Sequence, residues 1–209
     1  LSSSALCPRP LLFFISYCGQ RDQTELIVGS VRCVYETDLL DIGTGTVRIL
    51  VLYGAAETRA VGIDLSREML AVARANLESA GHANCQIRQG DMYQLPLPSE
   101  SFSVAVIHMV LHYADSPGAV IAEAARILRD GGRLVLVDLA PHREESLRTN
   151  QAHRRLGFSN SEIDRWYQRA NLVPDRTIKL SGDPLTITYP HPRPHETVLD
   201  LGCRQLPEK

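Results

Sequence analysis

The sequence predicts an α/β fold in which a parallel β-sheet is covered by helices on both faces. Between residues 38 and 188, short apolar runs alternate with segments of helical periodicity, which is typical of this class. Residues 102–108 form a nearly continuous apolar run, as expected for a central strand buried on both sides. A chain of 209 residues with 44% hydrophobic content can bury a sizeable core without metals or disulfides.

The first predicted elements are two strands and a helix. Asp38–Ile42 is a short apolar run that ends in the glycine turn Gly43–Gly45. Ala60–Asp64 is the second strand. Ser66 then offers an N-cap for a helix, and Gly81 is expected to end it.

The middle of the chain continues the alternation. Cys85–Arg88 and Phe102–His108 are predicted as the third and fourth strands. A helix is expected from Asp115-Ser116-Pro117 to the glycine pair at 131–132, since proline suits a first helical turn. Arg133–Asp138 is predicted as the fifth strand.

The last predicted elements are a helix and a hairpin. Ser159 and Glu162 have the spacing of a capping box, which predicts a helix through Ala170. Thr177–Leu180 and Leu185–Thr188 are expected to pair as an antiparallel hairpin, because a Gly- and Pro-containing turn separates them.

The two ends of the chain differ from the middle. Residues 1–36 show no sustained period and are poorly specified by the sequence. In residues 189–194 every second residue is proline, which favours an extended linker. We therefore expect one domain at 37–189 and an unstructured tail at 190–209.

Composition excludes several functions. The formal net charge is −2, so no excess of Lys and Arg predicts a nucleic acid or membrane partner. The longest apolar run, Leu11–Ile15, is too short to cross a bilayer. The five cysteines contain no CxxC pair, which indicates neither a disulfide framework nor a zinc site. A cytoplasmic enzyme is expected.

The glycine turn carries the clearest chemical signal. Glycines after a strand let a ligand approach the backbone, and exposed N–H groups there favour a carboxylate or phosphate. Asp64 ends the neighbouring strand, where an acid can accept both hydroxyls of a ribose. The expected ligand contains a nucleoside.

The spacing of the glycines narrows the choice of nucleoside. A dinucleotide fingerprint requires a glycine six positions along from Gly43, but Arg48 stands there. Asp41 would repel a pyrophosphate, whereas it could face the ammonium of an amino acid. S-adenosylmethionine is therefore the predicted cofactor, and a nicotinamide-dependent oxidoreductase is disfavoured.

Five segments in order resemble the successive motifs of class I S-adenosylmethionine-dependent methyltransferases: 41–45, 61–66, 90–92, 95–102 and 128–134. Within this class the chain is most similar to the small-molecule branch that includes ubiquinone/menaquinone-type enzymes. The segment from His108 to Ser159 resembles the methyltransferase half of bacterial arsenic-repressor-like fusion regulators. The resemblance implies a Rossmann-like, doubly wound sheet of seven strands, mostly parallel, in agreement with the expected hairpin.

The resemblance also implies a set of cofactor-binding residues: Asp41, Gly43, Thr44, Gly45, Asp64, Leu65, Asp91, Met92 and His108. By this analogy Asp41 lies near the cofactor ammonium and Asp64 holds the ribose hydroxyls. Leu65 and Met92 would pack on the adenine ring, and Asp91 would accept a hydrogen bond from its amino group. The glycines would contact the methionine end.

The implied reaction is direct displacement at the sulfonium methyl by a small-molecule acceptor, which yields S-adenosylhomocysteine. A general base is optional, and His108 and His112 are the candidates. These histidines are four residues apart and could share a helical face, but no carboxylate or cysteine stands at ligand spacing nearby, so no metal is predicted. The acceptor is not identified; an arsenic acceptor would call for a cysteine cluster, and none is apparent.

Val47 departs from the family pattern, which usually has a third glycine at this position. A β-branched side chain there could crowd the methionine moiety or the packing between helix and strand. If it crowds the methionine moiety, Val47→Gly should tighten cofactor binding. The alternative function is therefore a catalytically degenerate cofactor-binding or regulatory module on the same fold.

Overall fold

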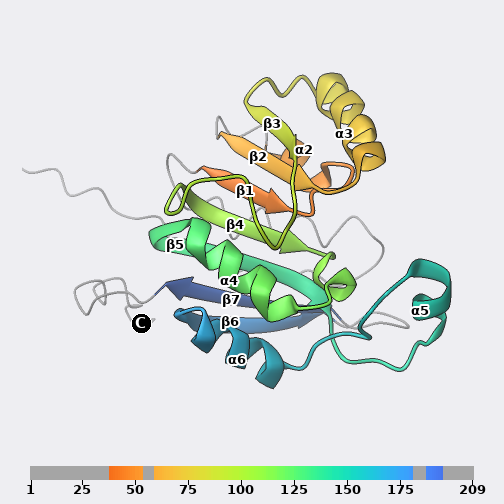
Figure 1. Ribbon diagram of the computed structural model, residues 1–209, viewed down its shortest axis with the longest axis vertical. Helices are drawn as coiled ribbons and strands as arrows, with labels where there is room; N and C mark the ends of the chain where they lie inside the picture. The colour runs from red at the N-terminus through yellow and green to blue at the C-terminus, as the bar shows by residue number, and fades with distance from the viewer. Residues whose placement is uncertain (1–37, 54–58, 181–186, 195–209) are drawn as a thin grey trace, which may run out of the picture.

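Seven strands form one sheet in the order β3-β2-β1-β4-β5-β7-β6. The computed structural model describes residues 38–53, 59–180 and 187–194, and Figure 1 shows the sheet with its covering helices. The elements are β1 (Leu39–Ile42), α2 (Arg48–Tyr53), β2 (Ala60–Asp64), α3 (Arg67–Ala80), β3 (Cys85–Gln89), β4 (Phe102–His108), η1 (Leu111–Tyr113), α4 (Pro117–Ile127), β5 (Leu128–Leu139), α5 (Ser146–Gln151), α6 (Asn160–Arg169), β6 (Leu172–Leu180) and β7 (Ile187–Pro194).

The pairing of the strands confirms the predicted fold class. Strands β1 to β5 are parallel, whereas β7 pairs antiparallel with both β5 and β6. Strand β1 lies between β2 and β4, with Leu39 opposite Ala60 on one side and Val104 on the other. The chain first proceeds outward from β1 to β3 and then returns to place β4 beside β1. Such a reversal opens a crevice at the carboxyl ends of the two central strands.

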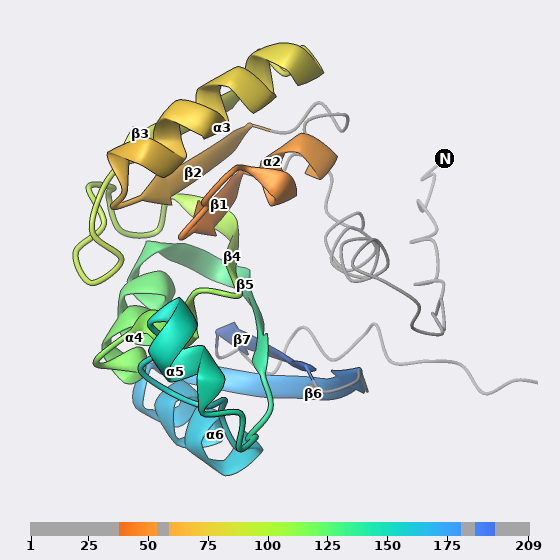
Figure 2. The same ribbon diagram turned by 90° about the vertical axis from the view of Figure 1, so that its right-hand side faces the viewer.

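The core consists of two clusters of buried side chains, one on each face of the sheet. Along β1 the side chains alternate, so that Leu40 and Ile42 belong to one cluster and Leu39 belongs to the other. The first cluster packs beneath α4 and α6, and the second packs beneath α2 and α3. Figure 2 shows α4 and α6 on the face opposite α2. Both faces of the sheet are therefore covered, as predicted.

Two predicted helix starts are confirmed in atomic detail. The Ser66 hydroxyl accepts a hydrogen bond from the Met69 N–H at 3.1 Å, and Gly81 ends α3 in the left-handed conformation. Both bonds of the capping box between Ser159 and Glu162 are present at the start of α6. Local sequence chemistry therefore fixes these helix ends.

The predicted C-terminal end of the helix that follows the fourth strand is wrong. Helix α4 ends at Ile127 rather than at the glycine pair 131–132, and β5 already begins at Leu128. Leu128 pairs with Phe102 of β4, so pairing with the central strand ends the helix early. Strand β5 is accordingly longer than the predicted Arg133–Asp138.

The predicted linker at residues 189–194 is also corrected, because this segment belongs to β7. Beyond Thr188, β7 pairs with β6 and no longer with β5. A strand with one free edge tolerates prolines, which lack a backbone N–H. Strand β6 likewise starts at Leu172, earlier than the predicted Thr177.

Several expectations fall on residues that the structure does not describe. These are the N-terminal segment 1–36, the hairpin turn at 181–184, residues 195–209 and four of the five cysteines. None of the helices within the described ranges has the length and apolar content needed to cross a membrane.

Candidate functional site

The glycine turn follows β1 at the crevice between the central strands. The N–H groups of Gly43 and Thr44 both donate to the Ile63 carbonyl, at 2.8 and 3.0 Å. Gly43 has φ of +74°, and a Cβ atom at this position would lie 2.5 Å from a methyl carbon of Val110. Only glycine fits there, and this close approach joins the turn to the segment after β4. Gly45 also has a positive φ, of +53°, but a Cβ atom there would meet nothing within 4 Å.

Asp41 is a buried acid just before the turn. Its carboxyl accepts a hydrogen bond of 2.6 Å from the Thr44 hydroxyl. Burial raises the pKa of Asp41 to about 7, and the nearby charge of Asp64 adds to this effect. A positive charge placed beside Asp41 would favour its ionised form again. The residue therefore suits the ammonium group that the sequence predicted for it.

Asp64 lies at the end of β2 and holds the turn through its carboxylate. One oxygen accepts the Gly45 N–H at 2.8 Å, and the other accepts the Ser66 N–H at 2.9 Å. Each carboxylate oxygen can accept more than one hydrogen bond, so both remain able to accept from a pair of hydroxyls. The adjacent Leu65 side chain is 66% exposed. An acid with fixed orientation thus lies beside an exposed apolar surface, which fits a ribose and a base.

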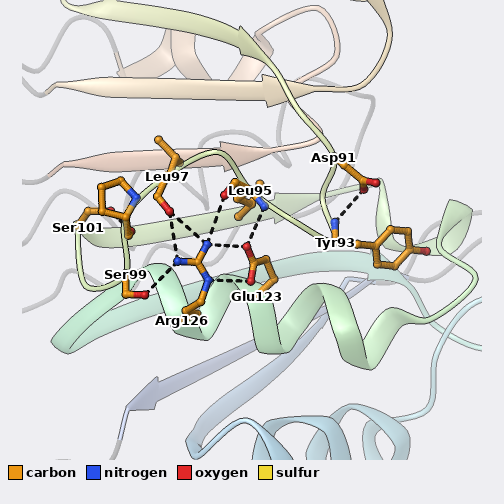
Figure 3. Close-up of polar contacts among 9 residues, drawn as sticks. Asp91, Tyr93, Leu95, Leu97, Ser99, Ser101, Glu123 and Arg126 are labelled. Atoms are coloured by element: carbon orange, nitrogen blue, oxygen red, sulfur yellow. Dashed lines mark hydrogen bonds and ion pairs between the residues drawn. The ribbon is translucent and has the colours of Figure 1, made fainter.

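Asp91 and Met92 follow β3. The Asp91 carboxylate is exposed and accepts a hydrogen bond of 2.9 Å from the Tyr93 N–H (Figure 3). Met92 is half-buried and packs against the core cluster beneath α4 and α6. The Tyr93 hydroxyl in turn accepts the Asp115 N–H at 2.8 Å, which ties this loop to the start of α4.

The loop that carries these residues is fixed to α4 by an ion pair. Figure 3 shows Arg126 and Glu123 of α4 side by side beneath the loop, with their side chains 2.6 Å apart. Arg126 donates to the Leu97 carbonyl and to the Ser99 hydroxyl, and Glu123 accepts the Leu95 N–H at 2.8 Å. The loop that carries Asp91 and Met92 is therefore held against α4 by several hydrogen bonds.

His108 ends β4, next to the glycine turn. Its Nε2 atom is buried and has no hydrogen-bond partner among the described residues. Burial lowers the pKa of His108 to about 4, which the Arg48 charge reinforces and the Asp138 charge opposes. The ring is therefore neutral near pH 7.

His112 does not share a helix with His108, contrary to one expectation from their spacing, because β4 ends at His108 and His112 lies in η1. The His112 Nδ1 atom is 2.8 Å from a carboxylate oxygen of Asp138 in β5. His153, from the connection between α5 and α6, stacks on the His112 ring with centroids 4.0 Å apart. Within the described part of the chain, no group of histidines, cysteines and acids is arranged to hold a metal ion.

Sequence reasoning did not predict that Asp138 and His153 contact His112. Asp138 had a usable signal, because it stands near the carboxyl end of a strand, as Asp41 and Asp64 do. His153 had none, since its approach to His112 depends on the folding of the connection after β5.

Val47 has φ of +64°, which is rare for a β-branched residue. Its side chain is fully buried in the cluster beneath α2 and α3, together with Leu39 and Leu50. The structure therefore favours an effect of Val47 on the packing between helix and strand over crowding of the methionine moiety.

The residues present fit S-adenosylmethionine. An acid suited to an ammonium, a glycine turn with open space above Gly45, and an acid beside an exposed apolar side chain follow one another along the crevice. The buried, unpartnered His108 Nε2 lies at the end of the adjoining strand. Both the order of these groups and their polarity match the cofactor from its methionine end to its base.

Comparison with known proteins supports the same assignment. Residues 40–136 match the family described as "Methyltransferase domain". The uncharacterized methyltransferase YcgJ of Bacillus subtilis (strain 168) is 29% identical over 120 residues, which cover 57% of this chain and 47% of that protein. Demethylmenaquinone methyltransferase of Tropheryma whipplei (strain Twist) is 33% identical over 106 residues, or 49% of this chain and 42% of that enzyme. The chain thus spans about half the length of these relatives or less.

A solved structure extends the likeness in three dimensions. The crystal structure of YcgJ from the same Bacillus superposes with a TM-score of 0.71 at 19% identity, covering 83% of this chain and 98% of that one. This similarity shows a shared fold. Together with the family match over residues 40–136 and the order of the crevice residues, it supports a class I S-adenosylmethionine-dependent methyltransferase.

Proposed function

We propose that the chain transfers the sulfonium methyl of S-adenosylmethionine to a small-molecule acceptor by direct displacement. One observation carries this proposal: Asp41, the glycine turn and Asp64 meet at the point where the strand order reverses. Ligands of open α/β sheets bind at such points. The name of the demethylmenaquinone relative supports a small-molecule acceptor.

The cofactor supplies an electrophile that its positive sulfonium already activates, so the protein chiefly aligns the reacting groups. In this proposal Asp41 attracts the ammonium, and Asp64 orients the ribose through both carboxylate oxygens. Leu65 and Met92 cover the faces of the base, and Asp91 accepts from its amino group. Alignment of this kind can supply roughly 7–11 kcal/mol of the barrier. In this proposal, His108 and His112 line the side of the crevice where the acceptor would bind.

The test is a calorimetric titration of the purified chain with S-adenosylmethionine, S-adenosylhomocysteine and NAD. We expect saturable binding of the two adenosyl ligands and none of NAD. Asp64→Asn should weaken adenosyl binding by about tenfold or more, because it removes a charged acceptor worth roughly 1.5–3 kcal/mol. Asp130→Asn is the matched control, because Asp130 is an exposed acid near the start of β5, at the opposite end of the strand from the site. NAD binding, or no adenosyl binding by a folded chain, would contradict the proposal.

The second candidate is a cofactor-binding module without turnover, which the left-handed Val47 favours. Turnover separates the two candidates. In the enzyme, S-adenosylmethionine labelled at its methyl should lose the label to an acceptor, whereas a module would bind it and return it unchanged.

A further inference from the structure

We infer that the chain has a second ligand site, beside the cofactor crevice, which binds a phosphate group. The site consists of two adjoining cavities of about 250 and 420 Å³, formed by the start of α4, by α6 and by the connection from β5 to α6. The cavities share Asp115 and Arg155, and together we call them the arginine cleft. Of the described residues assigned to the cofactor crevice, none lines either cavity. The inference therefore goes beyond the proposed function.

The lining of the arginine cleft is strongly basic. It includes four arginines: Arg148, Arg154, Arg155 and Arg169. Among the described residues that line the cleft, Asp115 is the one acid, and it forms an ion pair with Arg154. The lining thus has an excess of three positive charges. Because like charges held close together repel, a bound anion is favoured there.

Three of the guanidinium groups are available to a ligand. Within the described part of the chain, neither Arg155 nor Arg169 forms an ion pair or a side-chain hydrogen bond. Glu162 acts on Arg155 electrostatically, but its carboxylate is bound in the capping box of α6. Arg148 lies 3.6 Å from Glu145, and both of these side chains are exposed. Exposed pairs contribute little, so a phosphate can replace Glu145.

The backbone that carries Arg154 and Arg155 is held in place. Both of their N–H groups donate to the His112 carbonyl, at 3.0 and 3.2 Å. Gly157 also lines the cleft, and a Cβ atom at this position would clash with the Ala140 carbonyl just after β5. The connection is therefore packed closely against the end of the strand. A ligand meets arginines whose main-chain positions are already set, which lowers the entropic cost of binding.

The arginine cleft lies at the carboxyl ends of the strands, as the cofactor crevice does. The start of α4 follows β4 through η1, and Ala114, directly after η1, lines the cleft. Arg148 belongs to α5, which Figure 1 shows beyond the carboxyl ends of β4 and β5. The cleft and the crevice are thus neighbouring sites at one edge of the sheet.

The type and arrangement of the donors favour a phosphate over a carboxylate. The available guanidinium groups come from three places: Arg148 in α5, Arg155 in the connection before α6, and Arg169 in the last turn of α6. Each presents a planar fork that can bind two oxygens. A phosphate ester offers three acceptor oxygens and nearly two negative charges near pH 7. A carboxylate offers two oxygens and one charge, so it matches this lining less well.

Trp166 forms an aromatic wall of the smaller cavity. Its ring packs on Gly118 of α4, where a Cβ atom would lie 2.8 Å from a ring carbon. It also meets the Phe158 ring edge-on, with centroids 5.7 Å apart. A fixed aromatic surface beside the arginines suits the organic part of a phosphate ester. Because Trp166 is the one tryptophan of the sequence, its fluorescence is a local probe of the cleft.

The experiment titrates the full chain with inorganic phosphate, phenyl phosphate and benzoate, followed by tryptophan fluorescence and calorimetry. We expect phenyl phosphate to bind with a dissociation constant below about 1 mM, and benzoate to bind about tenfold more weakly or worse. Equal affinities for inorganic phosphate and phenyl phosphate would identify free phosphate as the ligand. Tighter binding of phenyl phosphate would identify a phosphate ester.

Substitutions at Arg155 test the lining directly. Arg155→Gln should weaken the binding of phenyl phosphate by about tenfold or more, because a charged hydrogen-bond donor is lost. Arg155→Lys should lose less, since it keeps the charge but not the planar fork. Arg165→Gln is the matched control, because Arg165 is an exposed residue of α6 outside the lining. Its affinity should stay within about twofold of wild type.

Further controls separate this site from folding and from the cofactor crevice. Circular dichroism checks each variant, and Arg148→Gln replaces Arg155→Gln if the latter does not fold. Saturating S-adenosylhomocysteine should change the affinity for phenyl phosphate by less than about threefold. Failure of S-adenosylhomocysteine to bind would refute the proposed function and leave this inference standing.

Four outcomes overturn the inference. The first is that neither phosphate binds saturably to the folded chain, and the second is that benzoate binds as tightly as phenyl phosphate. The third is an equal loss of affinity in Arg155→Gln and Arg165→Gln. The fourth is competition between phenyl phosphate and S-adenosylhomocysteine, which would place the phosphate in the cofactor crevice.

Discussion

The two halves of the crevice differ in how far apart their contacting residues lie in the sequence. In the half formed by β1 to β3, most contacts of the acids are short in sequence: Asp64 accepts the Ser66 N–H, two residues away, and Asp41 accepts the Thr44 hydroxyl, three residues away. Asp64 also accepts the Gly45 N–H, 19 residues away. In the half formed by β4 and β5, His112 binds Asp138, 26 residues further along the chain. The first half is specified by short sequence motifs, whereas the second exists only once the sheet has assembled.

The halves meet where Val110 packs on Gly43. The comparison predicts that a substitution at this contact perturbs both halves. A substitution within one half should leave the structure of the other half largely unchanged. Four sets of substitutions test this, in decreasing order of expected effect.

Gly43→Ala should have the largest effect, because the new methyl would lie 2.5 Å from Val110 in a backbone with φ of +74°. We expect a loss of about 3–5 kcal/mol in the free energy of unfolding, from overpacking and backbone strain together. Gly45→Ala, whose Cβ atom would meet nothing within 4 Å, should cost only about 1–2 kcal/mol of strain. Urea unfolding monitored by circular dichroism measures both; equal losses would mean that the Val110 contact does not join the halves.

Asp41→Asn tests the cofactor half through pH. Burial raises the pKa of Asp41 from 3.8 to about 7, so the folded protein keeps a proton that the unfolded chain releases as the pH rises across this range. Stability therefore falls from pH 4 to pH 7, and the amide avoids this loss. Above pH 7 we expect Asp41→Asn to unfold with up to about 4 kcal/mol more free energy than wild type, while binding S-adenosylmethionine more weakly.

Asp38→Asn is the control with the opposite sign. The pKa of Asp38 is lowered, chiefly by its hydrogen bond to Arg59, so its contribution is present above pH 4 and is lost as the pH falls. This variant should be less stable than wild type at neutral pH and equal to it in acid. Thermal melts from pH 3 to 8 compare the two variants with wild type. If the melting temperature of Asp41→Asn changed with pH in parallel with that of wild type, burial would not raise the pKa of Asp41.

Val47 separates strain from packing. Val47→Gly relieves the strain of a β-branched residue in the left-handed conformation, worth roughly 1–2 kcal/mol. It also loses buried side-chain area worth about 1.5–3 kcal/mol. We expect the free energy of unfolding of Val47→Gly to stay within about 1 kcal/mol of wild type. Val47→Ala keeps the backbone strain and should lower this free energy by about 2–3 kcal/mol. Because the side chain lies in the core, cofactor affinity of Val47→Gly should stay within about threefold of wild type. A large gain in affinity would show that Val47 crowds the methionine end.

The smallest expected effects come from the two helix caps. Ser66→Ala and Ser159→Ala each remove a side-chain cap and should cost about 1 kcal/mol. Ser66 follows the end of β2, so its loss should also weaken adenosyl binding slightly, while Ser159→Ala should not. If both caps altered binding equally, the separation of the two halves would be in doubt.

The sequence by itself determined the α/β class, the glycine turn, Asp41, Asp64 and the helix caps. Apart from the hydrogen bond between Asp64 and Gly45, these features depend on neighbours within a few residues, such as a hydroxyl before a helix or a glycine after a strand. It misjudged the end of α4 and the proline-rich β7, because strand pairing overrode local preference in both places.

The tertiary structure alone decided the rest of the site. Nothing in the local sequence of His112 indicates Asp138 or His153, and the spacing of His108 and His112 suggested a shared helix that does not form. Parallel strands bring distant segments together only at their carboxyl ends, after the crossover helices have packed. The residues of the proposed cofactor site therefore stand out in the motifs, whereas the positions of the histidines required the assembled sheet.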